Sequence, residues 1–169
     1  MKPVLESTRL KMIPFDMSET GLLHQTLTDP FVRKYLMDDE VIPDEKAGKF
    51  IQLNEQHFNE KSWGLWKIVV KKSNAYAGFA GLWIFFDEDQ PQLLYGLLPD
   101  KLKNGYAVEA ATAVVDYAFT NLKFNYITAA CDTPNTASQK VCERLNMVNM
   151  EHKEINGNQI TLYRLDKVI

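Results

Sequence analysis

The sequence predicts one domain of the α+β class, with mixed α/β order along the chain. Three observations lead to this prediction: the first third has helical periodicity, a strand hairpin begins at Trp63, and a strand–loop–helix–strand unit follows it. A chain of 169 residues with 46% hydrophobic content can bury a core of its own. No repeat, low-complexity tract or proline-rich linker divides it, so we expect a single domain over residues 1–169.

Two helical patterns fill the first third, at residues 18–29 and 43–60. Ser18 and Asp44 stand where N-caps are expected, because their side-chain oxygens can accept from the first free backbone N–H groups. This part of the chain is therefore predicted to be mostly helical.

Three strands are predicted next. Residues 63–72 alternate and are rich in β-branched and aromatic side chains, and residues 75–86 return as the second strand of a hairpin. The acidic segment 87–89, expected in a solvated loop, interrupts the pattern. Residues 93–98 then form a short apolar strand, which Pro99 ends because it lacks a backbone donor.

A helix and a strand complete a crossover unit. Apolar residues between Ala107 and Leu122 form a helical stripe, and Glu109 lies on the opposite face. Residues 125–131 predict the next strand. The shortest connection is a right-handed βαβ crossover, in which the strand at 93–98 runs parallel to this one.

The segment KLKNGYAVEAA, residues 101–111, joins the first of these strands to the helix. The first N–H groups of a helix have no internal partner and attract anions. Gly105 permits a close backbone approach there, and Lys101 and Lys103 add positive charge. These features predict a diphosphate site, although the segment has neither GxxxxGK[ST] nor GxGxxG. The alternative is that Gly105 only begins a helix and the lysines are solvated.

A second informative segment, DTPNTASQKVCERLNM, covers residues 132–147. Thr133 or Asn135 can cap its helix, and Ser138 and Cys142 share one face because they are four residues apart. Asn146 suits a left-handed helix end. The alternative is that Asn135 is only a cap and Ser138 a surface hydroxyl. The predicted buried stripe consists of Ala137, Val141 and Leu145.

Composition argues against several classes of function. The formal net charge is −3 and no basic run exceeds two residues, so we expect no nucleic-acid partner. No apolar stretch approaches the roughly 20 residues of a membrane span, and the N-terminus lacks a signal-peptide core, so a cytoplasmic protein without a membrane partner is expected. Cys131 and Cys142 lack CxxC spacing and are expected as free thiols. Neither they nor the histidines predict a metal site.

Six segments, in this order, resemble the GNAT superfamily of N-acetyltransferases over nearly the whole chain. They are LESTRLKMIPFDMSE, TDPFVRKYL, AGFAGL, LLYGLLPDKLKNGYAVEAATAVVDYAF, DTPNTASQKVCERLNM and ITLYRL. The branch they resemble is that of the RimJ- and RimL-type ribosomal-protein N-terminal acetyltransferases. The resemblance implies a mostly antiparallel, twisted sheet flanked by helices, with a central βαβ cofactor-binding unit and two central strands splayed apart around acetyl-CoA.

The resemblance also implies a set of contacts to acetyl-CoA. Backbone contacts are implied for Leu97 and Leu98, phosphate contacts for Lys103, Asn104, Gly105, Tyr106, Ala107 and Val108, and pantetheine contacts for Asn135 and Ser138. The family's phosphate loop has Gln or Arg, two residues, Gly, one residue, then Gly or Ala. Gly105 and Ala107 match it, but Leu102 replaces Gln or Arg, and Lys103 replaces a frequent further glycine.

Catalysis requires a deprotonated amine, a donor to the thioester oxygen and a proton for the thiolate. Backbone N–H groups near Leu98 are candidates for the donor. Many relatives place a tyrosine where Cys142 stands. The RimL-like branch uses a serine at the Ser138 position, so Ser138 is the candidate acid and Cys142 the substitute. The strand carboxylate that often acts as base is Gln92 here. The remaining candidates for the base are Glu55, His57 and Asp132.

These expectations describe an N-acetyltransferase in which an acceptor amine attacks acetyl-CoA directly. A protein N-terminal amine is the first candidate acceptor, and a polyamine, amino acid or aminoglycoside is the second. Two readings from other classes remain open: a noncatalytic acetyl-CoA-binding regulatory module, and an interaction domain that binds no CoA. Relatives often form dimers, so a homodimer is a further expectation.

Overall fold

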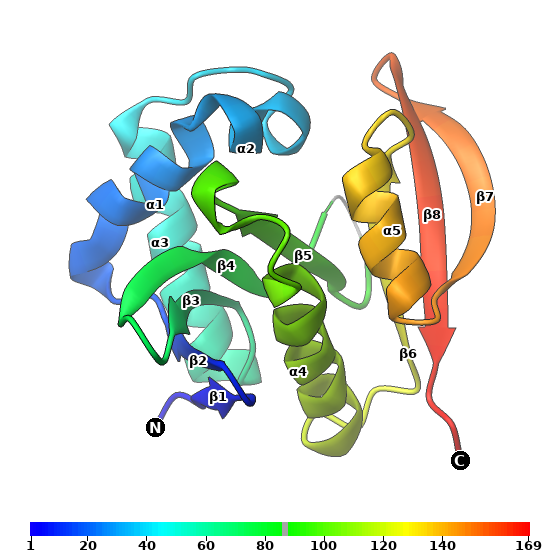
Figure 1. Ribbon diagram of the computed structural model, residues 1–169, viewed down its shortest axis with the longest axis horizontal. Helices are drawn as coiled ribbons and strands as arrows, with labels where there is room; N and C mark the ends of the chain where they lie inside the picture. Colours follow the sequence, from blue (N-terminus) through cyan, green and yellow to red (C-terminus); the bar gives the residue numbers. More distant parts are fainter. Residues whose placement is uncertain (86–87) are drawn as a thin grey trace.

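The structure is a computed structural model and describes residues 1–85 and 88–169. Figure 1 shows its helices and strands in space. In chain order they are β1 (Leu5–Glu6), β2 (Leu10–Pro14), the 3-10 helix η1 (Met17–Glu19), α1 (Thr20–Thr28), α2 (Pro30–Leu36), α3 (Asp44–Lys61), β3 (Leu65–Val70), β4 (Ala75–Trp83), β5 (Gln92–Leu97), the 3-10 helix η2 (Pro99–Lys101), α4 (Tyr106–Thr120), β6 (Tyr126–Asp132), α5 (Thr136–Arg144), β7 (Val148–Ile155) and β8 (Asn158–Asp166).

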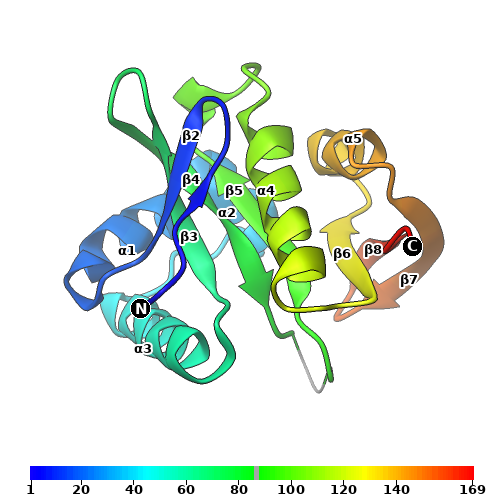
Figure 2. The same cartoon turned by 90° about the horizontal axis from the view of Figure 1, so that it is seen from below.

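Five antiparallel strands form the larger sheet, in the order β1-β2-β3-β4-β5. The β3–β4 pair is the predicted hairpin, with Val70 opposite Ala75 beside the turn. Successive side chains of a strand point to opposite faces. Leu65 and Phe79 therefore pack with α1 and α3, whereas Trp66 packs with α4. Helices cover both faces of this sheet (Figure 2).

Three antiparallel strands form the smaller sheet, in the order β6-β8-β7. Its β7–β8 hairpin turns at Asn156 and Gly157, whose φ angles are 51° and 83°. A two-residue turn with positive φ at both positions matches the right-handed twist of the strands, and Asn-Gly favours it. The hairpin predicted from the sequence NGNQ is confirmed.

The βαβ unit is present as β5–α4–β6, but its two strands belong to different sheets. Within the described residues no backbone ladder joins β5 to β6, so the two strands of the predicted crossover do not pair with each other. Side chains bridge the split instead. Gln90 Nε2 donates to the Tyr126 carbonyl at 2.6 Å, and Tyr95 from β5 reaches Ser138 on α5. The splayed arrangement that the family resemblance implied is the one observed.

The helix starts differ from the predictions. Asp16, rather than Ser18, caps the first helical turn in a reciprocal capping box with Glu19. Asp44 is the first residue of α3 and Pro43 occupies the cap position. The short helix α2 was not predicted, although Asp29 caps it through two backbone N–H groups. The second strand of the hairpin ends at Trp83, and Phe86 of its predicted range lies outside the described residues.

The predicted stripe on α5 is partly wrong. Leu145 is buried, but Ala137 is exposed and Val141 only half-buried. Cys142 is fully buried in their place. The face of α5 that meets the rest of the protein is therefore rotated toward Ser138 and Cys142. The helix begins at the cap Asn135, and Asn146 beyond its end has a left-handed φ of 61°.

Candidate active site

A cavity of about 790 Å³ is lined by residues of both sheets. Its wall includes β5, β6, β8 and α5, with α1 and α2 beyond them. The split between β5 and β6 is therefore open to a ligand, and the volume lies in the usual range for a small-molecule site. The cavity brings together four of the sequence-predicted site residues: Leu97, Ala107, Asn135 and Ser138.

The predicted phosphate contacts gather at the first turn of α4. Gly105 is the N-cap residue, has a left-handed φ of 77°, and provides no side-chain cap. The first N–H groups of α4, from Tyr106, Ala107 and Val108, thus face outward from a helix end with positive partial charge. The Asn104 side chain braces this loop, because its Nδ2 donates to the Leu102 carbonyl at 3.0 Å.

Lys103 also has a left-handed backbone, with φ of 64°. A residue with a Cβ is strained in this conformation, whereas glycine is not. The glycine that relatives frequently carry at this position thus has a conformational reason, and this chain keeps the conformation while adding a charge.

Arg9, on the turn between β1 and β2, lies beside the same helix end and was missed by the sequence reasoning. Its Nε donates to Glu109 at 2.7 Å, and its guanidinium lies 4.8 Å from the centre of the Tyr106 ring. A Cβ on Gly105 would lie 3.3 Å from Arg9 Nη2. Burial alone would raise the pKa of Glu109, but hydrogen bonds from Ser7 and Arg9 outweigh it and lower that pKa. Glu109 therefore holds Arg9 in place as an anion.

The backbone N–H and carbonyl of Leu98 both form hydrogen bonds within the protein. Its N–H donates to the Ala77 carbonyl at 3.0 Å and its carbonyl accepts from Lys101 N, so that N–H is already occupied. Leu98 does not line the cavity, whereas Leu97 does. An oxyanion donor was expected near Leu98. The N–H of Leu98 itself is not free for this role, because it donates to the Ala77 carbonyl.

The polar centre of the cavity is formed by α5 and β5. Asn135 Oδ1 accepts from Ser138 N at 3.2 Å and caps α5. The Tyr95 hydroxyl lies 2.9 Å from Ser138 Oγ, 3.6 Å from Cys142 Sγ, and donates to the Ser138 carbonyl at 3.0 Å. Tyr95 was missed because strand periodicity does not say which helix a side chain meets.

The domain pattern described as acetyltransferase (GNAT) matches residues 9–148. The chain belongs to the GNAT acetyltransferase family. It is an N-acetyltransferase, and several related proteins carry that name. One of them, the uncharacterized N-acetyltransferase p20 of Bacillus licheniformis, is 26% identical over 164 residues, which cover 94% of this chain and 92% of p20.

Solved structures share this GNAT fold over nearly their full length. A RimL ribosomal L7/L12 alpha-N-protein acetyltransferase in complex with coenzyme A has a TM-score of 0.81 at 19% identity, covering 97% of this chain and 98% of its own. The spermidine N-acetyltransferase of Vibrio cholerae, in complex with CoA and spermine, has a TM-score of 0.76 at 15% identity, covering 95% and 96%. At these sequence identities, the similarity to the two solved structures shows that the fold is shared and nothing more.

The thiols of this acetyltransferase form a buried pair beside Ser138. Cys131, on β6, lines the cavity, whereas Cys142 is fully buried behind it. A hydrogen bond between the two thiols raises the pKa of Cys131 and lowers that of Cys142. Because the Cys142 sulfur does not line the cavity, Cys142 is a weaker candidate acid than Ser138.

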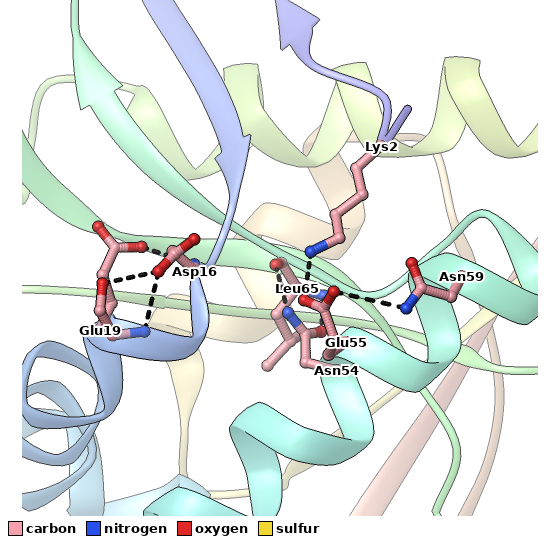
Figure 3. A network of polar contacts seen from close by, with 8 residues as sticks. Lys2, Asp16, Glu19, Asn54, Glu55, Asn59 and Leu65 are labelled. Carbon is pink, nitrogen blue, oxygen red and sulfur yellow. Dashed lines mark hydrogen bonds and ion pairs between the residues drawn. The ribbon is translucent and has the colours of Figure 1, made fainter.

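The three candidate bases lie in different places. Glu55, on α3, pairs with Lys2 and accepts from Asn59 (Figure 3), and it is not among the residues that line the cavity. His57 stacks 4.4 Å from Trp63, and burial lowers its pKa. Only Asp132 lines the cavity.

Three carboxylates line the cavity, those of Asp38, Glu88 and Asp132. Burial, and then the charge of Asp38, raise the pKa of Asp132, which favours a group that takes up a proton. Glu88, which the sequence placed in a solvated loop, also lines the cavity. Its Oε1 accepts from Gln92 Nε2 at 2.5 Å, and its buried Oε2 has no hydrogen-bond partner among the described residues. Gln92 thus holds a carboxylate from the preceding loop.

The described residues contain neither a metal-binding cluster nor a membrane-spanning helix. Within residues 1–85 and 88–169 no three His, Cys, Asp or Glu side chains gather as a metal site would require. None of the helices formed by those residues is long and apolar enough to cross a membrane.

Proposed function

We propose that this chain binds acetyl-CoA between β5 and β6 and transfers its acetyl group directly to a primary amine. The observation that carries the proposal is the cavity itself, which joins the split between the sheets to Ser138 at one wall and to Ala107, in the first turn of α4, at another. The first-turn N–H groups of α4, with Arg9 and Lys103 nearby, would hold the diphosphate. Asn135 and Leu97 would contact the pantetheine arm.

Bound acetyl-CoA would supply an activated thioester. A cavity carboxylate, Asp132 or Glu88, takes the proton of the acceptor ammonium so that the nitrogen lone pair can attack the carbonyl carbon. The C–N bond forms, the C–S bond breaks, and the electron pair of that bond goes to sulfur. Ser138 Oγ–H hydrogen bonds to this thiolate, and the proton shed by nitrogen completes the free thiol. Each bond formed, each bond broken and each proton is thus accounted for, and no covalent enzyme intermediate is needed.

A protein N-terminal amine is our first candidate acceptor. One wall of the cavity includes apolar side chains of α1 and α2, among them Leu27, Phe31 and Val32. Such a wall suits the side chains of a peptide better than a polyamine, which lacks apolar groups of that size and carries several charges. The related RimL structure acts on a ribosomal-protein N-terminus and the Vibrio cholerae neighbour on spermidine, so both classes need testing.

The proposal is tested in two stages. Calorimetric titration should give acetyl-CoA binding in the micromolar range that Gly105→Glu abolishes. Release of the CoA thiol is then followed with short peptides bearing a free α-amine, with the same peptides formylated at that amine, and with spermidine. Acetylation of free-amine peptides only supports the first acceptor, and acetylation of spermidine supports the second. Binding without turnover of any amine would indicate a regulatory module, and absence of binding would overturn the proposal.

A further inference from the structure

Tyr95 is a polar residue of the cavity to which the proposed acetyl transfer assigns no role. It comes from β5, and its hydroxyl crosses to α5, where it meets Ser138 Oγ at 2.9 Å and the Ser138 carbonyl at 3.0 Å. These contacts span the split between the two sheets, where no backbone ladder exists among the described residues. Both Tyr95 and Ser138 line the cavity, so the pair faces the space that a ligand would fill.

We propose that Tyr95 is a positioning residue for catalysis, which orients the Ser138 hydroxyl so that its proton points to the leaving thiolate. The inference rests on the proposed acetyl transfer and on Ser138 as the donor. The phenol has one proton, which donates to the Ser138 carbonyl and can be shared with Ser138 Oγ, because both acceptors belong to the same residue and lie within 3.0 Å of the hydroxyl. When it donates to Ser138 Oγ, that oxygen cannot turn its own proton toward Tyr95, and the serine proton is left free for the cavity.

The chain of donors is then Tyr95 O–H to Ser138 Oγ, and Ser138 Oγ–H to sulfur. Hydrogen bonds in such a chain polarise one another, which makes a serine hydroxyl a stronger donor than it is alone. Burial raises the pKa of Tyr95, so the phenol keeps its proton throughout the pH range of an assay. Tyr95 therefore strengthens the serine without giving up its proton, and the proton that completes the thiol is still the one shed by the amine.

Cys142 restricts the orientation of the Tyr95 hydroxyl. Its sulfur lies 3.6 Å from the Tyr95 hydroxyl on the side away from the cavity, and it is fully buried. The phenol is thus held between Cys142 and Ser138, and both neighbours restrict its rotation. A donor held in this way has little orientational freedom to lose when the transition state forms.

The test is a double-mutant cycle on acetyl transfer, with kcat and KM for acetyl-CoA measured separately. Ser138→Ala is expected to lower kcat about 100-fold, in the range of general acid catalysis. Tyr95→Phe is expected to lower kcat about tenfold, as for loss of one good hydrogen bond, with little change in KM. The double variant should be no slower than Ser138→Ala, because Tyr95 acts through Ser138.

Tyr76→Phe is the matched control. The Tyr76 hydroxyl is also half-buried on a strand of the larger sheet and bonded to a hydroxyl, that of Thr26 at 2.8 Å, but Tyr76 does not line the cavity. The variant Tyr76→Phe should lose about as much stability as Tyr95→Phe, but its kcat should equal that of the unmutated protein. Unchanged kcat in Tyr95→Phe, or effects of Tyr95→Phe and Ser138→Ala that multiply, would overturn the inference while leaving acetyl transfer intact. Failure of the unmutated protein to turn over would instead contradict the proposed function.

Discussion

Gly105 offers the sharpest test of the phosphate site, because its backbone conformation can be perturbed with a single methyl group. Its φ of 77° is a conformation that residues with a Cβ rarely adopt. A Cβ would meet nothing closer than Arg9 Nη2 at 3.3 Å, and a flexible guanidinium can move by the few tenths of an ångström required. Gly105→Ala should therefore fold, but with a strained or shifted loop.

The expected loss of stability follows from two opposing effects. The left-handed conformation costs a residue with a Cβ about 1–2 kcal/mol. The less flexible unfolded chain offsets about 0.4–1 kcal/mol of this. The net loss is about 1 kcal/mol, which lowers the Tm by roughly 2–4 °C in a protein of this size.

The variant Gly105→Ala should also bind acetyl-CoA more weakly. If the strain is relieved by turning the loop, the N–H groups of Tyr106 and Ala107 no longer converge on one anion. Loss of one hydrogen bond to a charged group corresponds to about tenfold in the Kd for acetyl-CoA. Calorimetric titration measures the Kd, and a thermal melt of the same sample measures the Tm.

Gly157→Ala is the matched control for this experiment. Gly157 has a φ of 83°, and a Cβ there would meet nothing within 4 Å. It lies in the β7–β8 turn and should lose similar stability while binding acetyl-CoA normally. Equal Kd values for the two variants would refute the assignment of the diphosphate to the α4 loop.

Two further predictions concern the loop and the base. Lys103→Gly should raise the Tm by about 1–3 °C, because it removes the left-handed strain of a residue with a Cβ, whereas Lys101→Gly should lower it. Asp132→Asn should raise stability at pH 7, since a carboxyl whose pKa is raised on folding destabilises the folded state once ionised, and this advantage should vanish as the pH falls through the Asp132 pKa. If Asp132 is the base, the same change lowers kcat about 100-fold, whereas an unchanged kcat together with a slow Glu88→Gln would assign the base to Glu88.

Local signals in the sequence predicted the backbone conformation well where a single residue type determines it. Asn156 and Gly157 form the expected hairpin turn, and Gly105 and Asn146 adopt the left-handed conformations that glycine and asparagine favour. These positions depend on sterics within a few residues. The same kind of signal was present for α2, where Asp29 precedes a proline, but a helix of seven residues shows too little periodicity to stand out.

Contacts between distant segments could not be predicted in this way. Arg9 meets Glu109 across 100 residues of sequence, and nothing in the composition of the first strands indicates that pairing. Tyr95 meets Ser138 across 43 residues, and strand alternation identifies only which side of the sheet it faces. The expected strand carboxylate illustrates the same limit, because Gln92 occupies its place and a carboxylate, Glu88, comes from the loop before it.

The split between the sheets explains why these distant contacts concentrate at the site. Two neighbouring strands that do not pair leave backbone donors and acceptors unmatched along their facing edges. In the proposed complex the amide groups of the pantetheine arm would satisfy such edges, and the side chains of Gln90 and Tyr95 bridge the split beside it. A residue that bridges an open split must come from one sheet and reach the other. The side chains that join the two halves are thus also the ones placed beside the ligand, and Tyr95 follows from the architecture rather than from any local motif.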